Sequence, residues 1–282
     1  MSPYLSTDVP PGDARLLIGS PECPECPECP EGRGSDSAAQ QVANRSREKL
    51  DPDPRSWVNP TGYPDSLALC VIDSIQSIGV RYTSVGNVLD RYRLYRRESG
   101  AEPSTDGVEA LLTTFTGVGG ASSWASKIGN QHKTSTRAGA PLKAEAVRAA
   151  AQALKQLGVL TAEDLRGTSG EALERTKAAW LGVPGQRSGI AWRYVLMLAG
   201  VPGVKPDRMI RRFVAAALSV PLNKVTADVA GDAVTRAANI LGVDVKALDH
   251  AIWRWQSGRT PPSASDRLIA ATRSATTGRH AG

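Results

Sequence analysis

The chain has 282 residues, of which 41% are hydrophobic, and its 34 Lys and Arg residues outnumber its 28 Asp and Glu residues to give a net charge of +6. This composition is sufficient for a sizeable core. No apolar run approaches the roughly 20 residues that span a bilayer, and the N-terminus lacks the basic and then apolar stretch of a signal peptide. We therefore expect a cytoplasmic protein, and the charge suits a polyanionic partner without requiring one.

Residues 1–55 are rich in Pro, Gly, Ser and charged residues and show no hydrophobic periodicity, which predicts a disordered arm. Cys23, Cys26 and Cys29 lie there in a Pro-Glu-Cys repeat. Their Cys-x-x-Cys spacing occurs in zinc sites, but three thiolates are too few for a closed tetrahedral site, so a tandem repeat is favoured and no metal is expected. Cys70 stands alone on an apolar helix face and is interpreted as inert core.

From Asp65 onward, apolar residues recur at helical spacing, and no segment has a convincing strand pattern. Thr161-Ala-Glu-Asp164 resembles a capping box, and Ser169 is placed to cap the helix that ends near Leu181. The prediction is an all-α domain over residues 56–258 followed by a flexible tail over 259–282. Further helices are predicted at about 65–78, 84–97, 105–116, 121–128, 142–157, 228–241 and 244–257.

The segment Leu181-Gly-Val-Pro-Gly-Gln-Arg-Ser-Gly189 separates two predicted helices. Its glycines permit a tight turn, and the unpaired amides of the following helix N-terminus can bind an anion such as a phosphate. Gln186, Arg187 and Ser188 add side-chain donors. An ordinary turn between two helices is the alternative.

Pro206 stands at an expected first helical position, with Asp207 directly after it. As a carboxylate at a helix N-terminus, Asp207 could simply interact with the helix dipole and with Lys205, Arg208 or Arg211.

The turn and the carboxylate about 20 residues downstream together resemble the helix-hairpin-helix DNA glycosylase superfamily, the endonuclease III-like proteins. The resemblance covers residues 63–257, including Lys127-Ile-Gly129 and the region of Trp253. It implies that Asp207 is catalytic and that Gln76 fills the gap beside a flipped nucleotide. It also implies that the hairpin binds the DNA backbone through Gly182, Val183, Gly185, Gln186, Arg187 and Ser188.

The chain departs from this family's pattern at informative positions. Val183 and Pro184 replace the central Gly-Val of the family hairpin, and no cysteine follows Cys70, so the iron-sulfur loop is absent. Arg187 stands where bifunctional members carry a nucleophilic lysine, and arginine stays protonated at all relevant pH values. The resemblance therefore implies a divergent, monofunctional enzyme without a cofactor.

The remaining candidates surround these elements. Lys205, Arg208 and Arg211 could contact phosphates, although a basic helix face is most often only solvated. A flipped base could stack in a pocket lined by Tyr82, Trp192 and His250, although a core position is the favoured interpretation of each.

We therefore expect a two-lobed helical domain, monomeric, that binds double-stranded DNA and hydrolyses the N-glycosidic bond of a damaged or modified base with Asp207. One rival is a non-catalytic helix-hairpin-helix DNA-binding module. Another is a globular protein with no nucleic-acid role.

Overall fold

A computed structural model of the chain describes residues 30–258. Within that part the protein is all-helical, and the only β-type pairing is an isolated bridge between Lys133 and Leu142. None of the helices over residues 30–258 has the length and apolar character needed to cross a bilayer. The α-helices are α1 (Pro30–Lys49), α2 (Leu67–Gln76), α3 (Tyr82–Glu98), α4 (Val108–Gly117), α5 (Ala121–Lys127), α6 (Lys143–Gln156), α7 (Ala162–Gly167), α8 (Gly170–Leu181), α9 (Ile190–Leu198), α10 (Arg208–Ala217), α11 (Ala227–Leu241) and α12 (Val245–Gln256), with short 3-10 turns η1 (Pro54–Ser56), η2 (Pro103–Thr105) and η3 (Leu222–Lys224).

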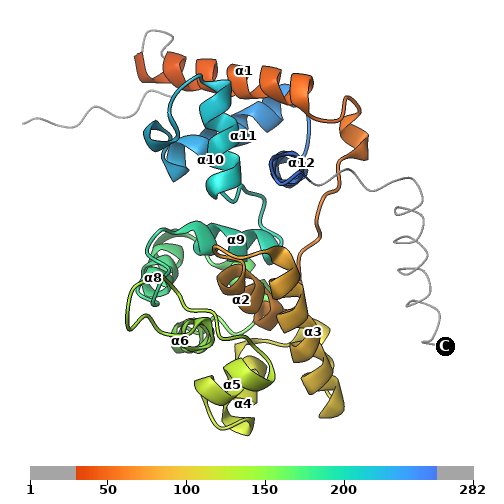
Figure 1. Cartoon of the computed structure of the whole chain (residues 1–282), viewed down its shortest axis with the longest axis vertical. Coiled ribbons are helices and arrows are strands. Elements are labelled where there is room, and N and C mark those ends of the chain that lie inside the picture. Colours follow the sequence, from red (N-terminus) through yellow and green to blue (C-terminus); the bar gives the residue numbers. More distant parts are fainter. Residues whose placement is uncertain (1–29, 259–282) are drawn as a thin grey trace, which may run out of the picture.

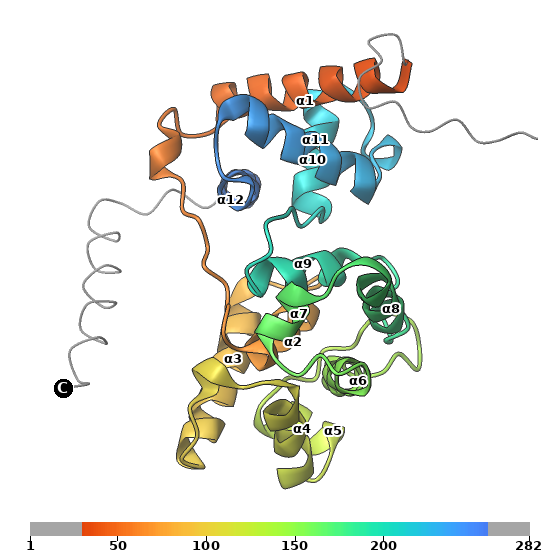
Figure 2. The same ribbon diagram turned by 180° about the vertical axis from the view of Figure 1, so that it is seen from behind.

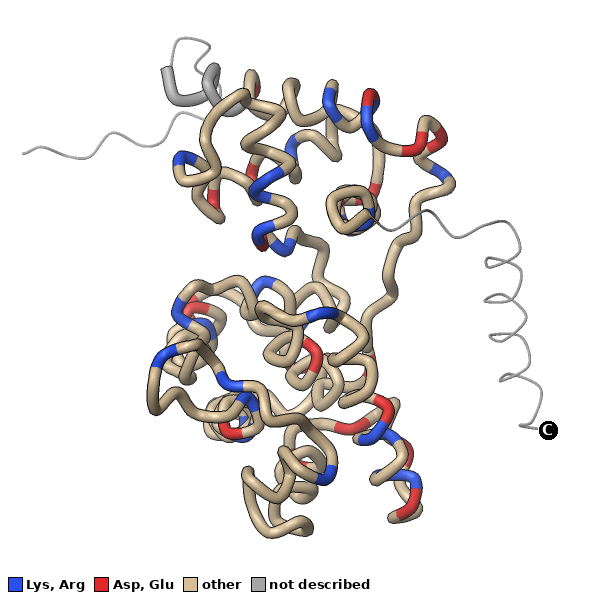
Figure 3. Tube along the Cα trace, viewed as in Figure 1, with Lys and Arg blue, Asp and Glu red and all other residues tan. Residues whose placement is uncertain are grey.

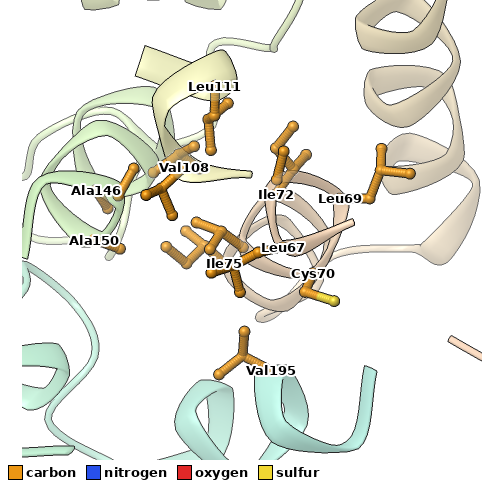
Figure 4. Close-up of a cluster of buried hydrophobic side chains, with 14 of the residues drawn as sticks. Leu67, Leu69, Cys70, Ile72, Ile75, Val108, Leu111, Ala146, Ala150 and Val195 are labelled. Atoms are coloured by element: carbon orange, nitrogen blue, oxygen red, sulfur yellow. The ribbon is translucent and has the colours of Figure 1, made fainter. Parts of the chain in front are cut away.

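The helices form two lobes, each around its own hydrophobic cluster (Figure 1). In the first lobe, α3 to α9 surround α2, and every residue of α2 is buried. Ser66 caps α2 by accepting a hydrogen bond from the Leu69 amide. Figure 4 shows side chains of α2 meeting Val108 and Leu111 of α4, alanines of α6 and Val195 of α9. The central helix is thus apolar on nearly all sides, as a buried helix should be.

The second lobe consists of α1, α10, α11 and α12, and its largest fully buried side chain is Phe213. Helix α1 lies across α10 and α11 (Figure 1). It contributes Val42 and Ala43 to the cluster, and the Arg45 guanidinium lies 5.5 Å from the centre of the Phe213 ring. Helix α1 is therefore part of the folded lobe.

The predicted arm over residues 1–55 was wrong for α1 and the turn that follows it. Ala39, Val42, Ala43, Ser46 and Leu50 are buried at helical spacing, and the Ser46 hydroxyl donates to the Val42 carbonyl at 2.8 Å. The stripe consists mainly of small residues, so its apolar signal is weak in the sequence although its periodicity is helical. The cysteine repeat at 23–29 and the predicted tail at 259–282 lie outside the described residues.

Two chain segments connect the lobes, residues 57–66 and residues 199–207 (Figures 1 and 2). Trp57 packs on the second cluster and Tyr63 on the first. The Tyr63 amide donates to the Leu198 carbonyl at 2.7 Å, so the two connections lie together where they meet the first lobe. Any side chain on these segments lies near the boundary between the lobes.

The predicted helices after residue 65 were confirmed, with small shifts at their ends. Thr161 and Asp164 form the predicted capping box. Ser169 occupies the N-cap position of α8, but its side chain makes no capping hydrogen bond. Pro206 lies one position before the N-cap instead of inside the helix, because Asp207 itself caps α10.

Candidate functional site between the lobes

Helices α8 and α9 are joined by a tight turn that fits the predicted hairpin. Gly185 has φ of 80° and Gly189 has φ of 70°, both in the left-handed region that favours glycine. The Val183 amide donates to the Trp180 carbonyl, and the Gln186 amide donates to the Val183 carbonyl. The glycine positions are therefore required by the backbone of the turn.

The turn exposes only some of the side chains expected to meet DNA. Gly182, Gly185, Arg187 and Ser188 are exposed. Val183 is 5% exposed in the first cluster and Gln186 is 3% exposed. Their side chains do not face solvent: the apolar Val183 side chain packs inward, and the Gln186 amide nitrogen donates to the Pro184 carbonyl of its own turn. A DNA contact of these two residues stays a prediction and would have to use their backbone. The exposed donors of the turn are consequently those of Arg187 and Ser188.

Gly185 also lies close to the loop between α5 and α6. A Cβ added there would lie 2.8 Å from the Thr134 Cβ, closer than such atoms approach in proteins. A larger residue at this position would disturb the fold as well as any ligand contact. Substitution of Gly185 is therefore a stability test and not a clean test of binding.

Asp207 is half-buried at the N-terminus of α10. Its Oδ1 accepts hydrogen bonds from the amides of Met209, at 2.7 Å, and Ile210, at 3.3 Å. Within the described residues, Oδ2 makes no hydrogen bond and the carboxylate forms no ion pair with an arginine. One oxygen is thus occupied by capping and the other is available to a ligand or a water.

Lys205 is half-buried and its ammonium is engaged within the protein, which does not fit the predicted phosphate contact. Its ammonium donates to the Ser77 hydroxyl at 3.0 Å and lies 3.6 Å from the centre of the Tyr194 ring. Burial lowers the pKa of Lys205, and the carboxylates of Asp207, Asp73 and Asp249 oppose that effect. Lys205 therefore links the two lobes and lies within the electrostatic influence of the nearby acidic side chains.

The basic residues of α10 divide by role. Lys and Arg positions gather at the end of α10 that faces the first lobe (Figure 3). Arg211 is half-buried and its Nε donates to the Val225 carbonyl at 2.7 Å, so it is fixed against the loop before α11 and was wrongly predicted as a free phosphate contact. Arg208 and Arg212 are exposed. Only the exposed pair is free to meet a polyanion.

Asp249 of α12 is a second carboxylate close to Asp207. It is 8% exposed, and its Oδ1 accepts the Lys205 amide at 3.0 Å. Burial raises the pKa of Asp249 to about 8, and the negative charge of Asp207 adds to the effect. At neutral pH, Asp249 therefore retains its proton.

Asp73, in the centre of α2, is fully buried. Its Oδ2 accepts hydrogen bonds from the hydroxyls of Tyr63 and Tyr82, each at 3.0 Å. Burial raises the pKa of Asp73 and the charge of Lys205 lowers it. We call Asp73, Ser77, Tyr82, Tyr194, Lys205, Asp207 and Asp249 the interlobe cluster.

Aromatic side chains at the same boundary include two of the three predicted pocket residues. Tyr82 is 36% exposed and meets Trp253 edge-on, with ring centres 6.4 Å apart. His250 stacks on Trp253 with ring centres 5.7 Å apart. Trp192 was wrongly placed in the pocket: it is 4% exposed and packs against Trp180 inside the first lobe. Tyr82 and His250 therefore both contact Trp253, and the three rings form one aromatic cluster.

Gln76 is fully buried, so its predicted role beside a flipped nucleotide does not fit its position. Its carbonyl accepts a hydrogen bond from the Lys143 ammonium at 2.8 Å, and the Ile78 carbonyl accepts another at 2.6 Å. Burial and the charge of Lys205 lower the pKa of Lys143 to about 8. Lys143 and Lys205 thus both stabilise the C-terminal end of α2, where a positive charge is favourable.

Sequence reasoning missed Asp73, Asp249 and Lys143. Asp73 had one detectable signal, since a carboxylate inside an otherwise apolar helix is expensive unless it is partnered. No group of three His, Cys, Asp or Glu side chains suited to a metal occurs in the part of the chain that the structure describes. The cluster places Asp249, a carboxyl whose pKa is raised by burial, close to a second carboxyl and beside aromatic rings, an arrangement typical of general acid-base chemistry.

Comparisons with known proteins give one match. A search of curated proteins and a search of solved structures each found no significant similarity. One family profile matches residues 40–257, which extend from α1 to the end of α12 and contain both lobes and the interlobe cluster. The chain therefore belongs to the family described as a domain of unknown function, DUF8548.

Proposed function

We propose that the protein binds double-stranded DNA and acts as a monofunctional DNA glycosylase, with Asp207 as its catalytic carboxylate. The observation that carries the proposal is the position of Asp207. It caps the start of α10 at the boundary between the lobes, and α9 and the connection over residues 199–207 separate it from the α8–α9 turn. Its Oδ1 is held by two amides and its Oδ2 makes no hydrogen bond. This arrangement agrees with the resemblance to helix-hairpin-helix glycosylases.

The chemistry needs a fixed negative charge beside the sugar. Breaking an N-glycosidic bond develops positive charge on the deoxyribose, which a carboxylate can stabilise while it orients a water molecule. The two hydrogen bonds to Oδ1 hold the carboxylate in place. Asp249 keeps its proton at neutral pH because burial raises its pKa to about 8, so it adds no competing negative charge next to Asp207.

DNA would bind across the α8–α9 turn and the start of α10. Arg187 and Ser188 of the turn and Arg208 of α10 are exposed for phosphate contacts. An extruded base would enter between the lobes near Tyr82 and His250. In this proposal the protein is a monomer without a cofactor, lies in the cytoplasm and acts on a damaged or modified base of DNA.

The absence of a lysine at position 187 makes the proposed enzyme monofunctional. An arginine guanidinium cannot form a Schiff base with the sugar. Borohydride should therefore trap no covalent complex with DNA, and a crosslink would contradict this part of the proposal.

A non-catalytic DNA-binding module is the second candidate, and the capping geometry favours it. Both hydrogen bonds of Oδ1 would be made equally well by an Asp207 that served only as the N-cap of α10. The two functions differ in base release, which only the first requires.

Asp207→Asn separates them, because asparagine keeps the size and capping ability of aspartate and removes its charge. Duplexes carrying uracil, alkylated or oxidised bases are incubated with protein and scored for alkali-labile sites. The Asn variant should bind DNA like the wild type and release base slower by orders of magnitude. Release at the wild-type rate would exclude catalysis by Asp207.

Asp244→Asn is the matched control. Asp244 caps α12 with hydrogen bonds to the amides of Lys246, at 2.8 Å, and Ala247, at 3.2 Å, so it repeats the capping geometry of Asp207 on another helix. The control should release base at the wild-type rate.

Arg187→Ala tests the DNA contact. It should weaken binding to all sequences alike and reduce the salt dependence of affinity by about one phosphate contact. Arg97→Ala is the control, because Arg97 is exposed at the far end of α3, away from α8 and α9 (Figures 1 and 2). If the DNA affinity of the two variants depended equally on salt, the DNA-binding surface would lie away from the α8–α9 turn.

A further inference from the structure

The buried face of α2 carries polar atoms that the fold leaves unsatisfied. Asp73 and Gln76 are both 0% exposed and lie three residues apart, on one side of the helix. Among the described residues, Asp73 Oδ1 and both amide atoms of Gln76 have no hydrogen-bond partner. Most buried polar atoms in proteins are paired, and an unpaired one costs stability. An exception in the interior of an otherwise apolar helix therefore requires an explanation.

The surroundings of Asp73 satisfy only one side of its carboxylate. Tyr63 and Tyr82 both donate to Oδ2. Lys205, whose charge acts on Asp73, directs its ammonium to Ser77 and to the face of Tyr194. Two tyrosine hydroxyls thus hold Oδ2, while Oδ1 remains without a donor.

The carboxylate lies near the boundary between the lobes. Tyr82, which holds Oδ2, is 36% exposed, and its ring meets Trp253 of the opposite lobe. Because Asp73 is 0% exposed, a ligand can reach Oδ1 only if a covering side chain moves, and we take this side chain to be Tyr82, the more exposed of the two tyrosines that hold Oδ2. A flat ring that enters there would meet aromatic faces first and then a single hydrogen-bond acceptor.

We propose that Asp73 Oδ1 recognises a base through its exocyclic amino group, so that the site selects amino-bearing bases over their oxo counterparts. Burial raises the pKa of Asp73, and the charge of Lys205 and the hydroxyls of Tyr82 and Tyr63 oppose that effect. The inference requires the ionised form of Asp73, because an ionised carboxylate accepts hydrogen bonds and cannot donate them, and it pairs with amino groups of bases for this reason. A carbonyl oxygen at the same position of the base would face another acceptor and be rejected. This inference rests on the proposed function, since it names the substrate class of the same interlobe site.

The test measures binding of free bases to the full-length protein by ligand-observed NMR and calorimetry. Adenine and hypoxanthine form one pair, and cytosine and uracil form another, because the members of each pair differ by an amino group against an oxo group. The wild type should bind the amino member about tenfold more tightly, which corresponds to one hydrogen bond to a charged acceptor. Equal affinity within both pairs would overturn the inference.

Asp73→Asn supplies the second arm. The amide has nearly the same shape and offers a donor as well as an acceptor, so the preference for the amino member should disappear. Asp90→Asn is the matched control: it makes the same acid-to-amide change at an exposed position of α3 outside the interlobe cluster, so it should keep the preference. Melting temperatures verify that each variant is folded. An unchanged preference in Asp73→Asn would overturn the role of Asp73.

The free-base assay contains no DNA, so its outcome is independent of base release. If the amino preference is found and no duplex is cleaved, the proposed function fails and the recognition site stands. If duplexes are cleaved and amino and oxo bases bind equally, the recognition site fails and the glycosylase proposal stands.

Discussion

Replacing Asp249 with asparagine should change how the stability of the protein depends on pH. Asp249 is 8% exposed and accepts the Lys205 amide through Oδ1, and burial raises its pKa to about 8 from the ordinary value of 3.8. The amide oxygen of asparagine can accept the same hydrogen bond. The substitution therefore removes the titration and keeps the geometry.

The sign follows from proton uptake. Between pH 3.8 and about 8, Asp249 holds a proton in the folded state and has lost it in the unfolded state, so unfolding releases a proton. The free energy of unfolding then falls as pH rises, by about 1.4 kcal/mol per pH unit for one such group. From pH 5 to pH 7 the loss due to Asp249 is about 3 kcal/mol. Asp249→Asn should lack this loss.

Urea unfolding at pH 5, 6 and 7 measures the effect, with Asp90→Asn as the control. Asp90 is an exposed carboxylate on α3 that water can solvate in both states. Burial also raises the pKa of Asp73, but this contribution is common to all three proteins and cancels in the comparison. The wild type and the control should lose stability with pH more steeply than Asp249→Asn. Parallel pH curves for all three would refute the buried, protonated state of Asp249.

Three further stability predictions concern the fold. Val42→Ala should lower the free energy of unfolding by about 2 kcal/mol because α1 buries this side chain completely; an unchanged value in denaturant titration would mean that α1 does not dock. Lys143→Met should cost about 2 kcal/mol by leaving the carbonyls of Gln76 and Ile78 without their donor, and unaltered urea unfolding would contradict that role. Gly185→Ala should cost about 1 kcal/mol or more, since φ is 80° and the new Cβ would lie 2.8 Å from Thr134; an equal melting temperature would show that the loop around Thr134 gives way.

The candidate site was predicted only where its signals are local in sequence. The positive φ values at Gly185 and Gly189 and the capping position of Asp207 follow from residue type and the order of elements. Side-chain direction did not follow. Val183 and Gln186 face inward although their neighbours Arg187 and Ser188 face solvent. Burial depends on what packs against each residue, and no local pattern in the turn specifies it.

The sequence by itself determined the helical class and the helices of residues 67–256, because apolar spacing and capping residues act over one or two turns. Tertiary structure alone decided that α1 joins the second lobe, since its buried stripe of small residues is stable only against α11. It also decided the environment of Asp73, Lys205 and Asp249. More than forty residues separate Asp73 from Lys205, and more than forty separate Lys205 from Asp249. Their pKa shifts arise from burial and from charges brought together by folding, so only the packed lobes could create them.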